Sequence, residues 1–137
     1  MRFMVIVKTG QLRESGSIPS AESMEKMGAF NEQLMKAGAL LSAEGLQPSS
    51  KGARITYSGG RPTVTDGPFA ETKELIGGFW IVQMKSKDEA LEWFSRCPFE
   101  NGEEIEIRQV TEPEEFAALL SESHRDRYQR FRETLAN

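Results

Sequence analysis

The sequence has few of the side chains that build disulfides and metal centres. Its 137 residues include one cysteine, Cys97, and one histidine, His124. A single cysteine excludes an internal disulfide, and two such ligands are too few for a structural zinc site. Cys97 precedes Pro98 at the end of a helical pattern and has no cationic cluster beside it, which favours a small buried apolar residue over a nucleophile. We therefore expect no metal ion and no cofactor.

Long apolar runs and an excess of positive charge are also missing. The apolar run at residues 3–7 is far shorter than a signal sequence or a membrane-spanning helix. The net charge of −4 gives no reason to expect binding to nucleic acid or to anionic membranes. A chain of this length fits one domain with a core of its own. We expect a cytoplasmic protein without nucleic-acid or membrane partners.

The pattern in the first half predicts a strand, a helix and a second strand. Residues 3–8 are apolar and β-branched, and residues 9–19 are rich in glycine and serine, which predicts a loop. Ser20 caps a predicted helix that ends at Gly38. Residues 39–46 then alternate as a strand. The apolar stripe of the helix consists of Met24, Met27, Phe30 (or Asn31) and Leu34.

A hairpin is predicted next, because two alternating runs flank a pair of glycines. Residues 54–58 and 61–66 lie on either side of Gly59 and Gly60. A two-residue turn of this kind needs positive φ, which glycine adopts freely. Pro62 cannot donate to a ladder, so its strand is expected at a sheet edge.

The second half predicts a strand, a helix, a strand and a helical tail. Residues 78–84 are apolar on both faces and predict a central strand, followed by a helix at 86–96 with a capping box of Ser86 and Glu89. Residues 105–110 alternate as the last strand. A further helix is predicted at 111–120 from a capping box of Thr111 and Glu114, and an amphipathic, arginine-rich helix at 121–137.

This order of elements predicts an α+β fold of the ferredoxin-like, split β-α-β type with an inserted hairpin. Two helices cover one face of such a sheet, so the other face needs a cover. We expect that face to carry part of the set Trp80, Val82 and Met84, and a homodimer to bury it by stacking sheet on sheet. A small-molecule pocket is then expected between the helix-free face, the hairpin and the loop that follows the hairpin.

That loop opens the signature segment, residues 65–80, where four ionisable side chains precede an apolar strand. They are Asp66, Glu71, Lys73 and Glu74. Ionisable groups on a loop that is anchored by a buried strand commonly form a binding or reactive site. The alternative is structural: Asp66 accepts backbone amides in a turn, Phe69 fills the core, and Lys73 pairs with a neighbouring glutamate at the surface.

Five segments together resemble the YciI-like proteins, and within them the subgroup named for its DGPF motif. They are FMVI at residues 3–6, AEGLQPSS at 43–50, TDGPFAETKE at 65–74, GGFW at 77–80 and EIRQV at 106–110. The resemblance covers about residues 1–112 and implies a YCII-related domain that forms a dimeric α+β barrel. Residues 113–137 are then a C-terminal helical extension that packs on the domain or on a sister subunit.

The resemblance transfers fold better than function. Relatives have a proposed catalytic pair, a histidine in the first helix and an aspartate before a proline after the second helix. In this chain Met27 and Cys97 stand at those positions. The pair is therefore absent, and it stays open whether the protein is an enzyme.

Three functional hypotheses follow. In the first, the protein is an acid–base enzyme of lyase or hydrolase type, with Asp66 or Glu71 as the general base and Lys73 holding an anionic group of the substrate. A minor variant of this hypothesis is a hard cation bound by Asp66, Glu71 and Glu44. In the second, a non-catalytic dimer binds a small, mostly apolar molecule. A third is a regulatory or protein-interaction role through the arginine-rich tail, linked to transcription because family members are often encoded beside sigma-factor genes. The expected ligand-binding residues are Glu44, Arg54, Phe69, Glu74 and Trp80.

Overall fold

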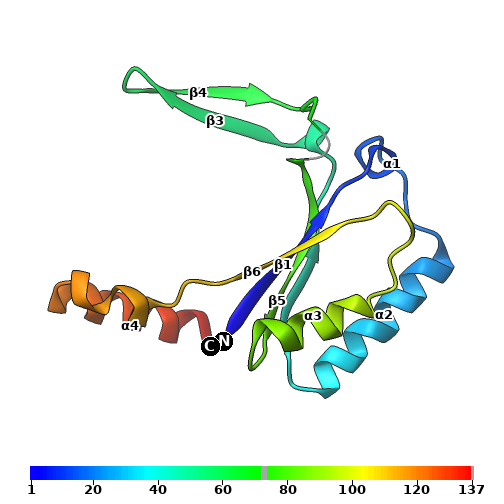
Figure 1. The fold of residues 1–137 in the computed structure, drawn as a ribbon. Helices are drawn as coiled ribbons and strands as arrows, with labels where there is room; N and C mark the ends of the chain where they lie inside the picture. The colour runs from blue at the N-terminus through cyan, green and yellow to red at the C-terminus, as the bar shows by residue number, and fades with distance from the viewer. Residues whose placement is uncertain (72–73, 137) are drawn as a thin grey trace.

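The computed structural model describes residues 1–71 and 74–136, without the side chains of residues 11 and 12. Its main sheet has four antiparallel strands in the order β2-β5-β1-β6, which is the ferredoxin-like order predicted from the sequence (Figure 1). The central position of β5 is also as predicted. The strands are β1 (Arg2–Lys8), β2 (Leu40–Gly45), β5 (Ile76–Gln83) and β6 (Ile105–Gln109).

Two helices cover one face of this sheet (Figure 1). The helix α2 (Ala21–Lys36) begins at Ser20, whose side chain accepts a hydrogen bond from the backbone N–H of Ser23. The helix α3 (Lys87–Ser95) begins at Ser86 in the same way, with Glu89 as the donor. The expected loop at residues 9–19 also contains a short helix, α1 (Gln11–Glu14), and a 3-10 turn, η1 (Ser49–Lys51), follows β2.

The core between sheet and helices is built around aromatic rings. Phe30 of α2 lies edge-on to Trp80 and Phe94, with ring centroids 6.5 and 5.5 Å apart. Trp80 and Phe94 are themselves 5.3 Å apart. Such edge-to-face pairs stabilise beyond the area that they bury. The remaining buried core residues are Phe3, Val5, Val7, Leu34, Ala39, Val82, Met84 and Ala90.

The residues predicted to lie on the helix-free face were wrong. Trp80, Val82 and Met84 belong to the core under the helices. Side chains alternate along a strand, so the opposite face of β5 carries Phe79 and Ile81. Their cross-strand partners in β1 are Ile6 and Met4. The helix-free face is therefore apolar along its centre, as the dimer hypothesis requires, but with a different set of residues.

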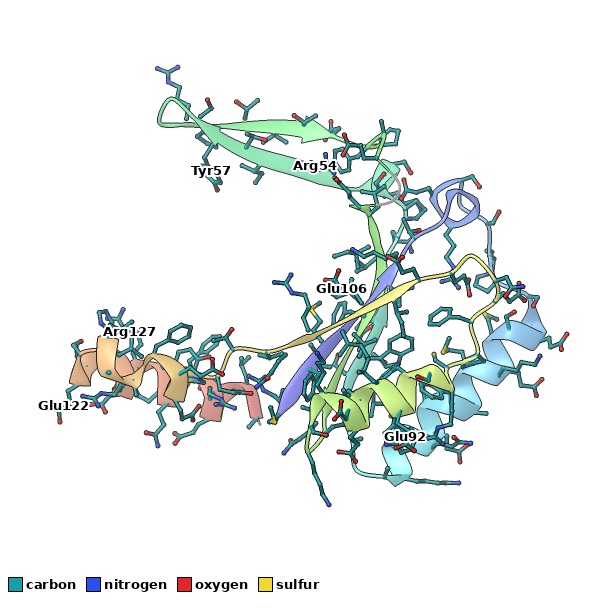
Figure 2. All side chains as sticks on the ribbon, viewed as in Figure 1. Arg54, Tyr57, Glu92, Glu106, Glu122 and Arg127 are labelled. Atoms are coloured by element: carbon teal, nitrogen blue, oxygen red, sulfur yellow. The ribbon has the colours of Figure 1, made fainter. Side chains whose placement is uncertain are left out.

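The predicted hairpin forms a separate two-stranded sheet of β3 (Ala53–Ser58) and β4 (Arg61–Asp66). The turn residues Gly59 and Gly60 have φ of 60° and 77°, the positive values that the sequence predicted. The hairpin projects from the end of the main sheet on its helix-free side, and every residue of both strands is exposed (Figure 2). This exposure distinguishes the hairpin from the body of the protein, which consists of the main sheet packed against α2 and α3.

The C-terminal arm consists of a 3-10 segment, η3 (Pro113–Leu119), and the helix α4 (Glu122–Ala136). The predicted capping box of Thr111 and Glu114 was wrong: the cap is Glu112, whose box partner is Glu115. Pro113 directly after the cap fixes φ for the first turn. The predicted helix at 111–120 is thus a 3-10 segment at Pro113–Leu119, and its cap lies one residue later than expected.

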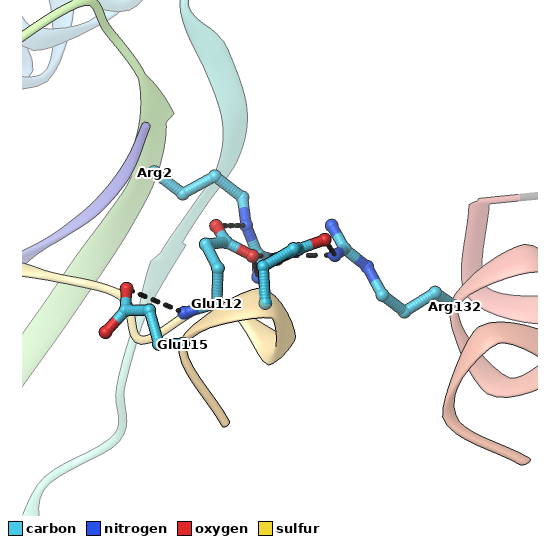
Figure 3. Close-up of polar contacts among 5 residues, drawn as sticks. Arg2, Glu112, Glu115 and Arg132 are labelled. Carbon is cyan, nitrogen blue, oxygen red and sulfur yellow. Dashed lines mark hydrogen bonds and ion pairs between the residues drawn. The ribbon is translucent and has the colours of Figure 1, made fainter. Parts of the chain in front are cut away.

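An ion-pair cluster attaches the arm to β1 (Figure 3). Two nitrogens of Arg2 lie 2.8 and 3.0 Å from the two carboxylate oxygens of Glu112, and Arg132 of α4 approaches Glu112 to 3.5 Å. The hydrogen bond from Arg2 lowers the pKa of Glu112, and Glu112 in turn raises the pKa of Arg2.

Within the described ranges, no helix is long and apolar enough to cross a membrane.

Candidate functional site

The signature segment is held in place by Ser49 of η1. The backbone N–H and the hydroxyl of Ser49 donate to the two carboxylate oxygens of Glu14, at 2.8 and 2.5 Å. The Ser49 oxygen also accepts a hydrogen bond of 3.1 Å from the backbone N–H of Phe69. Hydrogen bonds from Ser49 lower the pKa of the Glu14 carboxyl. One serine thus links the α1 loop to the loop after the hairpin.

Gly67 is needed for this arrangement. Its backbone N–H donates to the carbonyl of Gly52 at 3.0 Å, and its peptide bond to Pro68 is cis. A Cβ atom at position 67 would lie 1.7 Å from the carbonyl oxygen of Ser49. Only glycine therefore permits the two loops to approach this closely.

Two of the expected ligand-binding residues contact each other instead of a cavity. The Arg54 guanidinium lies 3.8 Å from the ring centroid of Phe69, a cation–π contact. Phe69 is half-buried at this site and is not part of the core, so the structural alternative in which it fills the core was wrong. Arg54 and Phe69 hold the base of the hairpin against the signature segment.

The expected catalytic carboxylates are exposed. Asp66 ends β4 opposite Ala53, and among the described residues its side chain has no hydrogen-bond partner, so it does not cap a turn as the structural alternative expected. Glu71 hydrogen-bonds to Glu74 and raises the pKa of that carboxyl. Lys73 lies outside the described residues. The loop therefore brings Glu71 and Glu74 together, while Asp66 takes no part in that pair.

A hollow lies elsewhere, beside the N-terminal half of α2. It has a volume of about 680 Å³ and is bounded by α2, the paired ends of β2 and β5, and the loop between α3 and β6. Glu44 and Trp80 line this α2 hollow, as two of the expected ligand-binding residues. None of the described residues between 53 and 74 lines it, so this hollow is not the pocket that was expected beside the hairpin.

The floor of the α2 hollow is fixed by a hydrogen bond. The indole N–H of Trp80 donates to the side-chain oxygen of Asn31 at 2.8 Å. Met27, which stands at the position of the relatives' histidine, lines the hollow together with Phe99. Cys97 lies two residues before Phe99 in the sequence. Burial raises the pKa of its thiol to about 12, as expected for an unreactive cysteine. The hollow thus has an apolar floor without a catalytic pair.

Charged groups surround this floor. Besides Glu44, the lining includes Glu100 and Glu103 from the loop before β6, and Arg13 from α1. These residues were missed in the sequence, because they lie far apart along the chain and match no motif. Asn31 had a weak signal, since it shares the apolar stripe of α2 with Phe30. The remaining polar lining residues, Ser17, Ser20 and Ser23, belong to the start of α2 and the loop before it.

A second hollow of about 590 Å³ adjoins the first. Arg13 and residues 17–19 line both, so the segment that follows α1 forms their shared wall. Glu14, which binds Ser49, lines the second hollow. Within the described part of the chain, no group of three or more histidine, cysteine, aspartate or glutamate side chains could hold a metal ion.

A family model, that of the YCII-related domain, matches residues 1–114 of this chain. The chain belongs to the YCII-related family. The match covers the main sheet, both covering helices, the hairpin and the start of η3, while α4 lies beyond it.

This YCII-related chain is similar to two known proteins. An uncharacterised protein of Rhizobium meliloti is 39% identical over 70 residues, which are 51% of this chain and 56% of that protein. The aligned part is thus only about half of the relative's length. The chain is also similar to a solved structure, that of the 5-chloro-2-hydroxyhydroquinone dehydrochlorinase from Burkholderia phenoliruptrix in complex with 2,5-dihydroxybenzoquinone. The sequences are 16% identical and the TM-score is 0.42, over 83% of this chain and 98% of that one. A likeness of this degree says nothing about the chemistry of this chain.

Proposed function

We propose that this YCII-related protein is a cytoplasmic homodimer that binds a small, mostly apolar molecule in the α2 hollow. The observation that carries the proposal is the hollow itself, with about 680 Å³ of space beside Trp80, whose indole is hydrogen-bonded to Asn31. Sites for small molecules have volumes of roughly 300–1,000 Å³, apolar walls and a few polar groups that orient the ligand. The hollow has this composition, with Phe99 and Met27 beside Trp80 and with Arg13 and Glu44 as polar groups.

The helix-free face of the sheet supports the dimer. Met4, Phe79 and Ile81 are only half-buried on this face, and charged side chains such as Lys8 and Glu106, 3.7 Å apart, border them. An apolar centre with a polar rim is the usual composition of a protein–protein interface. A second copy that presents the same face would bury both centres, since an isologous contact uses one surface twice.

Ligand binding is tested with three small aromatic probes that differ in charge: benzoate, phenol and benzamidine. Thermal-shift and tryptophan-fluorescence titrations are suited to this site, because Trp80 lines the hollow and the second tryptophan, Trp93, does not. We expect at least one probe to raise the melting temperature and to change the fluorescence. A protein that responds to none of the three, across the solubility range of each, would refute the α2 hollow as a site for small aromatic molecules.

A hollow-filling variant gives the matched control. Gly28 lines the hollow, and a Cβ atom there meets nothing within 4 Å, so Gly28→Leu fills the space without a clash. Ala29→Leu places the same side chain next along α2 at an exposed position that does not line the hollow. We expect Gly28→Leu to abolish the response to the probe and Ala29→Leu to retain it. An unchanged response in Gly28→Leu would place the binding elsewhere.

One observation favours a second candidate, acid–base catalysis by the signature segment. Glu71 raises the pKa of Glu74, and a carboxyl with a raised pKa is better matched to proton transfer near neutral pH. Asp66, Glu71 and Lys73 remain the proposed catalytic residues of this candidate, and the raised pKa of Glu74 bears on it through the hydrogen bond between Glu74 and Glu71. It is tested by an NMR titration of the Glu74 carboxyl in the wild type and in Glu71→Gln. A normal pKa for Glu74 in both would remove the support for this chemistry.

A further inference from the structure

The hairpin and the C-terminal arm leave the sheet at opposite ends of its strands. The hairpin follows Gly45 of β2 and returns into Ile76 of β5, which pairs with Lys8 at one end of β1. The arm follows β6, where the N–H of Val110 donates to the carbonyl of Arg2 at the other end of β1. Both project on the helix-free side (Figure 1). They therefore flank the face on which the proposed second copy lies.

One face of the hairpin is apolar and uncovered. Ile55 pairs with Val64 across the ladder, and Tyr57 pairs with Pro62, so all four share one face. Ile55, Tyr57 and Val64 are 56%, 78% and 64% exposed. Tyr57 lies on the side of the hairpin that faces the arm (Figure 2). A two-stranded hairpin is at best marginally stable by itself, so this face needs an apolar cover.

The arm carries an apolar stripe that is equally uncovered. Tyr128, Phe131 and Leu135 recur at intervals of three and four residues along α4 and so lie on one side of the helix. The rings of Tyr128 and Phe131 are 6.3 Å apart, and Phe131 and Leu135 are 57% and 70% exposed. This stripe cannot reach the hairpin of its own chain, because the seven residues of β1 separate them by about 23 Å.

We propose that, in the dimer, the apolar face of each hairpin packs on the α4 stripe of the second copy. The two-fold axis of this dimer lies between the two stacked sheets and perpendicular to their strands. The strands of the two copies therefore run in opposite directions. This arrangement brings the hairpin end of one copy to the arm end of the other. The contact then occurs twice, with a hairpin and an arm at each end of the dimer. This inference rests on the proposed sheet-to-sheet dimer and adds the occupant of the hairpin face.

Symmetry and charge both disfavour a second hairpin as this occupant. The same two-fold axis places the two hairpins at opposite ends of the dimer. The hairpin also carries Arg54 and Arg61 against the single carboxylate of Asp66, so two hairpins in contact would bring like charges together. The α4 helix carries charges of both signs, with its carboxylates on the side away from the stripe, so its contact with the hairpin is an apolar one.

Cysteine cross-linking tests this contact directly. Wild-type protein supplies the background, because its only cysteine, Cys97, is half-buried and its thiol has a pKa of about 12. Ser58→Cys places a thiol beside the hairpin face, and Gln129→Cys places one beside the α4 stripe, both at exposed positions that leave the apolar residues intact. The full-length single variants and the double variant are treated with a short bismaleimide and separated on a denaturing gel.

We expect a covalent dimer from the double variant and none from the wild type or either single variant. Cross-linked Ser58→Cys alone would show that hairpins pair with hairpins, and cross-linked Gln129→Cys alone would show that arms pair with arms; either result overturns the proposal. Light scattering separates the two levels of inference. A dimer without the hairpin-to-arm cross-link overturns only the arm contact, while a monomer at all concentrations overturns the dimer itself.

Discussion

The four-stranded body and the two projecting segments are made of the same kinds of residues, but they are stabilised differently. Val5 and Val82 in the body are fully buried, whereas Ile55 and Val64 in the hairpin, which are also β-branched strand residues, are more than half exposed. Alternation of side chains determines that a strand forms, and burial depends on whether another layer lies against it. In the hairpin and in α4 that layer is absent from the single chain.

The two regions also differ in how they are attached. The body is joined by apolar packing around Phe30, Trp80 and Phe94. The projecting segments are joined at their bases by polar contacts: Ser49 with Glu14 near the hairpin, and Arg2 with Glu112 at the arm. Polar contacts of this kind fix a direction but contribute little net stability. Substitutions in the two regions should therefore differ in their effect on stability.

Removing a core ring gives the largest effect. Phe30→Ala deletes a ring that contacts three others, and we expect the free energy of unfolding to fall by about 3–5 kcal/mol. Phe131→Ala on the arm is the matched change. Measured by urea unfolding at a concentration where the chain is monomeric, it should shift the free energy by no more than about 0.5 kcal/mol. Equal losses for the two variants would erase the distinction between body and arm.

The loop contact at Gly67 is expected to come next. Gly67→Ala forces a Cβ atom against the carbonyl oxygen of Ser49, so we expect a loss of about 1–3 kcal/mol in thermal or urea unfolding. Gly28→Ala is the control, because that site in α2 is open and alanine favours a helix by up to about 1 kcal/mol. Destabilisation by both variants would mean that the loss at Gly67 has no steric origin.

A charge on the hairpin face should affect association and leave folding unchanged. Ile55→Asp would raise the dimer dissociation constant at least tenfold, about 1.4 kcal/mol, because it introduces a carboxylate into the proposed apolar contact. Thr56→Asp places the same charge on the opposite face of β3. Analytical ultracentrifugation measures both, and equal weakening by the two variants would contradict a specific role of the apolar face.

Acid should loosen the arm before it unfolds the body. The pKa of Glu112 is lowered in the folded protein, so its contribution is complete above the ordinary glutamate pKa of about 4.3 and is lost as the pH falls through the lower folded value. Glu112→Gln should mimic this loss at neutral pH, by about 1 kcal/mol. Hydrogen exchange of α4 amides is the measurement, with the exposed Glu122→Gln as the control. Unchanged protection of α4 in Glu112→Gln would show that the ion pairs do not hold the arm.

The smallest effect is expected at Asp66. Its exposed carboxylate has no partner among the described residues, so Asp66→Ala should change the free energy of unfolding by no more than about 0.5 kcal/mol. A drop in the melting temperature of several degrees would instead restore the view that this residue holds the turn together.

Much of the fold was predictable, because strong local signals agreed with it. The glycines at 59 and 60, the caps Ser20 and Ser86, and the order of strands and helices were all read from the sequence and are present in the structure. The site was less predictable. Of the expected ligand-binding residues, Glu44 and Trp80 line the α2 hollow, while Arg54 and Phe69 bind each other. Loop charges look alike in a sequence, whether they face a cavity or solvent.

The sequence by itself determined which segments become strands, helices and turns, because periodicity and capping act over a few neighbouring residues. It also determined the absence of disulfides and of the relatives' histidine and aspartate. Packing of the whole chain placed Trp80 under the helices, joined Glu14 to Phe69 through Ser49, and formed a hollow between α2 and the ends of β2 and β5. These features depend on residues far apart in the chain, and their contact is settled only when the whole sheet is assembled.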